Sequence, residues 1–165
     1  MILEFKGEHR WLSNFWEQPG IAIPAFGIRV PTVEHGYQAA KCRNESERRM
    51  ILQARTPGTA KRLGQDVELR ADWEDVKEAV MHTLLRRKFA HVGLMAELLH
   101  TGDQLLMEGN KHRDDYWGAI PAKMDRILRT PANRIVYPAQ GWVGLNRLGE
   151  LLMQVRSELL VLRGL

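Results

Sequence analysis

Apolar residues recur at helical spacing in two long stretches of the chain. The first predicts a helix over residues 73–90, capped by Asp72, with basic residues near its C-terminal end where they suit the helix dipole. The second predicts a last helix from about Leu145 to Leu160. Capping and stop signals predict shorter helices after Thr32, near 45–55 after Asn44, from Thr56 to Gly64, and over 94–100.

Short runs of strand-forming residues alternate with these helices. Residues 2–5 and 104–108 are typical of strands, and residues 21–23 and 28–30 flank a Pro- and Gly-containing connection that indicates a hairpin. A few short strands with several helices packed around them make an α+β fold. The 165 residues suit a single domain over 1–165.

Composition narrows the class of protein. Hydrophobic residues make up 44% and charged residues 27%, which is typical of a soluble globular domain and argues against disorder. No apolar run approaches the roughly 20 residues that span a membrane, so no membrane partner is expected. Cys42 is the only cysteine, which excludes an internal disulfide. Glu4 places a charge where the apolar region of a signal peptide would begin, so no signal peptide is expected. We therefore expect a cytoplasmic protein.

The net charge of +4 permits an anionic partner. A phosphorylated metabolite, a dinucleotide or nucleic acid would each fit, and the same charge is also common in domains that are merely soluble. Basic residues are dense between Lys41 and Arg62, where a solvated helical face is the competing interpretation.

The helix after Thr32 carries the most informative polar pattern. Glu34, Gln38 and Lys41 are spaced i, i+4, i+7 and therefore share one face, beside an apolar face. A carboxylate in the first turn is stabilised as the anion and suits a base that activates water, or a group that stabilises positive charge. A surface helix with a Glu–Gln pair gives the same spacing.

Three other segments hold candidate residues. Asn14 lies between aromatics after a predicted strand, where a tight turn is the alternative. Asp115 lies two residues before Trp117, which predicts a carboxylate beside an aromatic wall; an Asx-turn with Trp117 in the core is the alternative. Asn146 lies between two glycines at the start of the last helix, where an anion site or plain capping would fit.

Several kinds of site lack support. The six histidines show no metal-ligand spacing, and there is no phosphate-binding glycine loop or serine-hydrolase motif. We therefore expect neither a metal nor a cofactor. Cys42 is open to two interpretations, a nucleophile or, more commonly, a buried thiol.

Taken together in their order, the motifs resemble the NADAR family, the YbiA-like N-glycosidases. The resemblance runs from Leu12 to about Arg156, most of the chain. Its carriers are Leu12-Ser13-Asn14-Phe15, Pro31-Thr32-Val33-Glu34-His35-x-Tyr37-Gln38-Ala39-x-Lys41, Leu63-Gly64, Arg70-x-Asp72-Trp73-Glu74, Met81, Lys88-Phe89, Leu98-Leu99-x-Thr101-Gly102, Asp115-x-Trp117-Gly118, and the run from Gly144 through Asn146 and Gly149 to Arg156.

This resemblance implies cleavage of the bond between a ribose and a nitrogenous base or amine. The sugar would be ribose 5-phosphate, as in phosphoribosylaminopyrimidine intermediates of riboflavin biosynthesis, or ADP-ribose attached to guanine in nucleic acid. A non-catalytic module that binds ADP-ribose or a nucleotide is the third hypothesis. The partner is then a phosphoribosylated or ADP-ribosylated small molecule, with nucleic acid left open. One departure is a basic insert at about 119–143, where some family members have a short glycine-rich link.

The resemblance also suggests a role for each candidate. Glu34 is the first candidate for the catalytic carboxylate and Asp115 the second, because positive charge builds at the anomeric carbon. Lys41 and Lys88 would bind phosphate or act as a nucleophile that forms a Schiff base. The predicted substrate-binding residues are Asn14, Gln38, Trp73, Lys88, Trp117 and Asn146, with Trp117 stacking on the base.

Overall fold

The computed structural model describes residues 1–17, 21–23, 27–125, 135–137 and 141–164. It divides into two compact units, Met1–Ser13 with Glu97–Leu165, and Asn14–Ala96. We call the first the terminal unit and the second the central unit. The expectation of one domain over 1–165 stays a prediction. Residues 126–134 and 138–140 of the basic insert lie outside the described residues.

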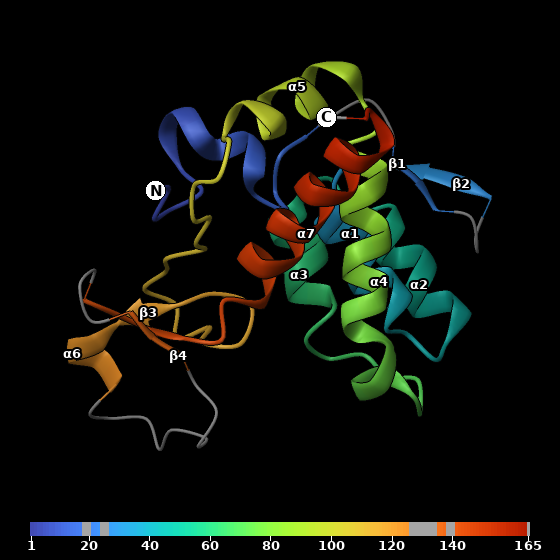
Figure 1. The fold of residues 1–165 in the computed structure, drawn as a ribbon. Coiled ribbons are helices and arrows are strands. Elements are labelled where there is room, and N and C mark those ends of the chain that lie inside the picture. Colours follow the sequence, from blue (N-terminus) through green and yellow to red (C-terminus); the bar gives the residue numbers. More distant parts are fainter. Residues whose placement is uncertain (18–20, 24–26, 126–134, 138–140, 165) are drawn as a thin grey trace. The chain divides into compact units, whose positions relative to one another are not determined.

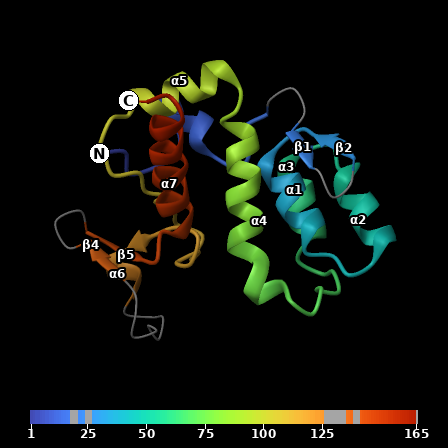
Figure 2. The same cartoon turned by 45° about the vertical axis from the view of Figure 1, so that its right-hand side comes forward.

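The central unit is a set of helices with one hairpin (Figures 1 and 2). Helix α1 contacts each of the other three helices of this unit, and β1 pairs antiparallel with β2, Ile21 opposite Val30. The elements are β1 Ile21–Ile23, β2 Ile28–Val30, α1 Val33–Ala40, α2 Glu45–Leu52, α3 Pro57–Leu63 and α4 Trp73–Lys88. The predicted strand pair and the predicted helices of this stretch are confirmed, whereas residues 24–26 of the predicted hairpin connection lie outside the described residues.

Side-chain caps explain three of these helix starts. The Thr32 hydroxyl accepts a hydrogen bond from the His35 N–H, and Asn44 and Thr56 cap α2 and α3 in the same way. Asp72 occupies the N-cap position of α4, as predicted, but its side chain does not act as the cap. Its carboxylate makes no cap hydrogen bond and pairs instead with the Arg70 guanidinium at 2.5 Å. The Arg70 guanidinium competes with the free N–H groups of the first turn of α4 for the Asp72 carboxylate.

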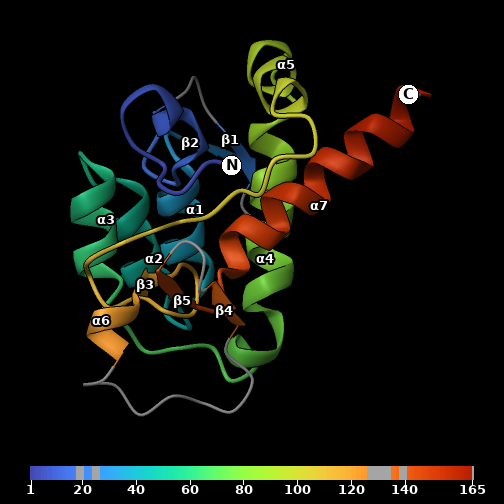
Figure 3. The same cartoon turned by 60° about the vertical axis from the view of Figure 1, so that its left-hand side comes forward.

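The terminal unit joins a short sheet to the last helix (Figure 3). Strand β5 lies between β3 and β4, antiparallel to both, and leads directly into α7. The elements are η1 Gly7–Leu12, β3 Ile120–Pro121, α6 Ala122–Asp125, β4 Ile135–Tyr137, β5 Trp142–Gly144 and α7 Arg147–Leu162; α5, Val92–His100, spans the boundary between the units. The apolar periodicity predicts the last helix, whereas none of the three strands was predicted.

The two strands predicted at 2–5 and 104–108 are reduced to a single parallel bridge. The Ile2 N–H donates to the Leu105 carbonyl, and the Met107 N–H donates to the Ile2 carbonyl. Gly109 then bonds to the Leu3 carbonyl, where a regular parallel ladder would use Glu4. This slip in register ends the pairing, so the segments run side by side without forming strands.

These helices and small sheets make up the expected α+β class. None of the helices in the described part of the chain has the length and apolar character that a bilayer crossing requires.

A buried arginine ties α7 to the segment after α5. Arg156 is 7% exposed, and its Nη1 donates to the Thr101 hydroxyl at 2.7 Å and to the Gln104 carbonyl at 2.9 Å. Burial lowers the pKa of this guanidinium, while Asp103 acts in the opposite direction. The two bonds hold α7 to the turn that follows α5.

We expect Arg156→Met to lower the free energy of unfolding by about 2 kcal/mol or more, because it leaves the Thr101 and Gln104 oxygens without their donor. Urea unfolding measures the change. Arg163→Met, at an exposed position after the same helix, is the control and should have little effect. Equal effects of the two substitutions would contradict the structural role.

Candidate active site

Helix α1 holds a buried carboxylate with a dedicated donor. Glu34 is 5% exposed and Gln38 is 6% exposed, and Gln38 Nε2 donates to Glu34 Oε1 at 2.8 Å. Every residue from Val33 to Ala39 is buried. The alternative of a surface helix is therefore wrong. A carboxylate removed from water needs such donors to stay ionised.

Lys41 follows α1 and is electrostatically coupled to Glu34. Burial lowers the pKa of Lys41, and the charge of Glu34 partly restores it. Lys61 adds to the lowering as a second cation nearby. A lysine with a lowered pKa carries more of its amine in the neutral, nucleophilic form. The sequence spacing predicts Glu34 and Lys41 on one helix face, and Lys41 is the residue that ends α1.

Asn14 supports α1 from the segment that precedes the hairpin. Its carbonyl accepts the Glu34 N–H at 3.0 Å, and its side-chain nitrogen lies 3.5 Å from Met81 Sδ in α4. The side-chain oxygen of Asn14 is buried with no hydrogen-bond partner among the described residues. Asn14 therefore keeps one acceptor unused beside the helix that carries Glu34.

Helix α4 contributes the two other predicted residues of this unit. Trp73 is 6% exposed and packs against Tyr37 of α1, with ring centroids 5.0 Å apart and planes tilted by 57°. Lys88, at the other end of α4, is fully buried, and its ammonium lies 5.3 Å from the centre of the Phe89 ring. The central unit thus holds six of the predicted residues: Asn14, Glu34, Gln38, Lys41, Trp73 and Lys88.

The buried side chains of Cys42 and His35, which flank Gln38 in the sequence, are not catalytic candidates. The Cys42 thiol donates to the Gln38 carbonyl at 3.4 Å, and burial raises the pKa of that thiol. A thiol held in its protonated form is a poor nucleophile, which favours the buried-thiol interpretation. His35 is fully buried, with Nδ1 2.8 Å from the Thr32 hydroxyl and Nε2 3.0 Å from the Ala54 carbonyl.

These contacts make His35 a source of pH-dependent stability. Burial lowers the pKa of His35 below its usual 6.5, against smaller opposing effects of Ala54 and Glu17. Because the unfolded chain then binds the proton more readily, the free energy of unfolding should fall as the pH drops below about 6.5. His35→Gln should flatten this dependence in urea unfolding between about pH 5 and about pH 8. His100→Gln, at an exposed histidine, should leave the dependence unchanged. A slope unaltered in His35→Gln would contradict the assignment.

Asp115 and Trp117 lie on a loop of the terminal unit, and hydrogen bonds of the Asn110 side chain hold this loop in place. Asn110 is 6% exposed, and its amide bonds to the carbonyls of Asp114 and Ala119 and accepts from the His112 N–H. The Asp114 carboxylate accepts the Trp117 N–H at 2.9 Å, three residues along the chain, whereas an Asx-turn bonds to the N–H two residues along. Trp117 is half-buried and not a core residue, which leaves part of its ring accessible.

Asn146 has a different environment from the one predicted. It is fully buried, in a left-handed conformation with φ of 49°. Its Nδ2 donates to the Leu106 carbonyl at 2.9 Å, and its Oδ1 accepts the Glu108 N–H at 3.0 Å. The amide therefore joins the start of α7 to the segment before the loop. This geometry assigns Asn146 a structural role and gives no support to a direct contact with substrate.

Residues that the sequence analysis did not single out organise both units. Asn110 follows a glycine, a pairing typical of turns that would have pointed to it. His35 follows the capping Thr32 by three residues, so its ring lies where that hydroxyl can reach it. In the described residues, no three His, Cys, Asp or Glu side chains are grouped so that they could hold a metal ion.

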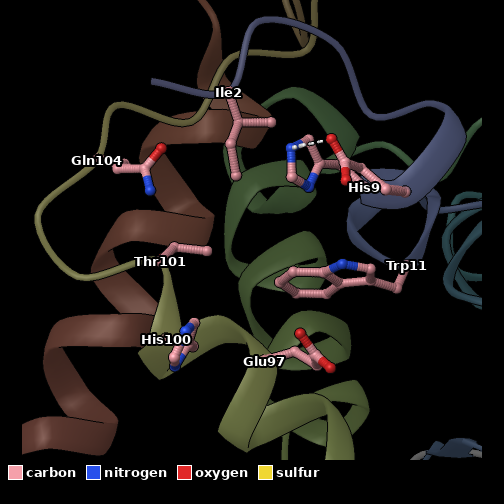
Figure 4. A pocket seen from close by; sticks show the side chains of 8 residues that line it. Ile2, His9, Trp11, Glu97, His100, Thr101 and Gln104 are labelled. Carbon is pink, nitrogen blue, oxygen red and sulfur yellow. Dashed lines mark ion pairs between the residues drawn. The ribbon is translucent and has the colours of Figure 1, made fainter.

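A separate hollow of about 260 Å³ lies in the terminal unit (Figure 4). The Trp11 indole lies opposite side chains from the end of α5, including Glu97 and His100, and a Glu8–His9 ion pair of 3.7 Å lies at its edge. None of the predicted site residues lines this hollow.

Comparison with known proteins decides the family. The model of the NADAR domain matches residues 4–160. The chain belongs to the NADAR family. It is similar to the N-glycosidase YbiA of Escherichia coli K12, with 37% identity over 152 residues that cover 90% of this chain and 81% of the relative. An N-glycosidase of Nostoc punctiforme is also 37% identical, over 78% of this chain and 73% of that protein.

The solved structure of the E. coli protein YbiA supports the same family and fold. It superposes with a TM-score of 0.74 at 33% identity, over 98% of this chain and 84% of that chain. A riboflavin biosynthesis protein of Vibrio vulnificus is 32% identical over 92% of this chain, which spans only 36% of that longer protein. NADAR relatives named N-glycosidases confirm the enzyme class, a hydrolase of N-glycosyl bonds.

Proposed function

We propose that this NADAR enzyme hydrolyses the bond between ribose 5-phosphate and the amine nitrogen of a phosphoribosylaminopyrimidine. The observation that carries the proposal is the buried Glu34 carboxylate, held by the Gln38 amide at 2.8 Å and coupled to Lys41. An anion fixed in a poorly hydrated site stabilises positive charge far better than one in water.

The hydrolytic route uses Glu34 directly. As the C–N bond breaks, positive charge builds on the anomeric carbon, and the carboxylate stabilises it and orients the attacking water. The water oxygen bonds to the anomeric carbon, and one water proton is transferred to the departing nitrogen. Asp115 is the second candidate for the carboxylate, on the loop that also carries Trp117.

A covalent route through Lys41 competes with direct attack by water. The neutral amine attacks the anomeric carbon, the pyrimidine nitrogen departs with a proton, and the ring-opened sugar remains as an imine on the lysine. Water then hydrolyses the imine and releases the sugar phosphate. The lowered pKa of Lys41 supports this route. Lys88 is the second candidate lysine, with phosphate binding as its other proposed role.

The choice of substrate rests on the relatives and on the residues available for binding. Riboflavin biosynthesis proteins of Vibrio vulnificus and Zea mays contain stretches that match this chain. Asn14, with its unused buried acceptor, and Trp73 are proposed to contact the substrate. The competing substrate is ADP-ribosylated guanine in nucleic acid, which the net charge of +4 favours.

Turnover by the wild type and by Glu34→Gln tests the proposal. We expect ribose 5-phosphate to be released from a phosphoribosylaminopyrimidine, and kcat to fall at least about a hundredfold in the variant, because the charge that stabilises the transition state is lost. Mass spectrometry of the products measures both. Glu74→Gln removes a charge from the exposed first turn of α4 and should retain activity.

Other outcomes of the same assay would replace this proposal. Release of ADP-ribose from modified guanosine or DNA, without action on the pyrimidine, would make the protein an eraser of that modification. Ligand binding without turnover of any of these compounds would favour a binding module. Wild-type turnover by Glu34→Gln, together with its loss in Asp115→Asn, would reassign the carboxylate to Asp115.

Borohydride reduction during turnover tests the covalent route. We expect a stable sugar adduct on Lys41, located by peptide mass spectrometry, and its absence from Lys41→Arg. Lys61→Arg changes an exposed lysine near the same residues and should still form the adduct. No adduct at Lys41 or Lys88 while product accumulates would leave direct attack by water as the route.

A further inference from the structure

We propose that Gly64 is a positioning residue: its missing side chain provides the space in which the Gln38 amide lies while it donates to Glu34. The inference rests on the proposed function, because it concerns the same carboxylate. Gly64 does not contact Glu34 in this account. It acts through the side chain between them.

The contact between Gly64 and Gln38 is steric and close. Gly64 follows the last residue of α3 and has an ordinary φ of −68°, so its backbone does not require glycine. A Cβ added there would collide with Gln38 Oε1 and lie 2.8 Å from Gln38 Cδ and 3.0 Å from Gln38 Cβ. The requirement at position 64 is therefore for space, not for conformational freedom.

Neither the Gln38 side chain nor the Gly64 backbone can easily move to make room for a side chain at position 64. Gln38 is 6% exposed, so its amide cannot swing into water without leaving a buried site. The Gly64 N–H donates to the Ala60 carbonyl at 2.9 Å, which holds the backbone at the end of α3. Gln38 Oε1 has no hydrogen-bond partner within the described part of the chain. Contact with Gly64, and not a hydrogen bond, thus fixes the oxygen end of the amide.

The Glu34 carboxylate selects the end of the amide that faces it, because only the NH₂ group can donate to an ionised carboxylate. With the oxygen against Gly64, the NH₂ group points at Glu34, where it favours the ionised form. A side chain at position 64 would displace the amide and remove this donor. Glu34 would then be protonated more readily, and the active form of the enzyme would be lost at higher pH than in the wild type.

The same helix supplies a matched control. Gly58 lies near the start of α3, and the nearest atom to an added Cβ there is Thr56 Oγ1 at 3.9 Å. Gly58→Ala therefore adds the same methyl group to the same helix without a collision. Any general effect of replacing glycine in α3 should appear in both variants, whereas an effect through Gln38 should appear only in Gly64→Ala.

The kinetic test is a double-mutant cycle with the phosphoribosylaminopyrimidine as substrate. We expect kcat to fall about tenfold or more in Gly64→Ala, with the acid limb of its pH–rate profile moved to higher pH, and neither change in Gly58→Ala. In a Gln38→Ala background, Gly64→Ala should have little further effect, because the colliding amide is gone. Additive effects of the two substitutions, or an unmoved acid limb, would overturn the inference.

A second measurement does not depend on turnover. The side-chain NH₂ resonances of Gln38, assigned by their absence in Gln38→Ala, should shift with pH as Glu34 titrates. That response should persist in Gly58→Ala and disappear in Glu34→Gln and Gly64→Ala. If the wild type does not act on the pyrimidine but the resonances respond in this way, the proposed function fails and the positioning role stands. A response that persists in folded Gly64→Ala would overturn the positioning role itself.

Discussion

A carboxylate taken out of water imposes a strict requirement on everything around it. Glu34 lies on a helix whose residues 33–39 are all buried, and an ionised group in such a place needs donors or cations to replace its hydration. Gln38, one turn along, supplies an N–H, and Lys41, nearly one further turn along, supplies a nearby charge. The packing of the central unit keeps water away from these three polar side chains. Helices α2, α3 and α4 all contact α1, and the carbonyl of Asn14 accepts the Glu34 N–H.

The local chemistry of the sequence predicted much of this unit. The starts of α1, α2 and α3 follow from Thr32, Asn44 and Thr56, because a capping hydroxyl or amide acts on the next few residues only. The face shared by Glu34 and Gln38 follows from the helical repeat. The burial of that face could not be predicted, because it depends on α2–α4 packing against α1. The contact between Gln38 and Gly64 joins residues on different helices, so spacing along the chain gave no sign of it.

The terminal unit was harder to predict because its order comes from asparagine side chains that bond to the main chain of other segments. Asn146 bonds to the backbone of Leu106 and Glu108, and Asn110 gathers the carbonyls of the loop that carries Asp115 and Trp117. Such bonds leave no periodic trace in the sequence. The sequence alone does not distinguish an asparagine that holds a loop from one that binds a ligand. The motif around Asn146 therefore predicts substrate binding, although the side chain has a structural role.

The contact between positions 38 and 64 has an evolutionary consequence. Two residues that share one small volume cannot drift independently, since a methyl group gained at 64 demands a shorter side chain at 38. NADAR homologues that keep glutamine at the position of Gln38 should therefore keep glycine at that of Gly64. Lineages that lose the glycine should also lose the glutamine. In a family tree of this fold, the two substitutions should therefore occur on the same branch. Such branches would mark changes in the chemistry of the carboxylate.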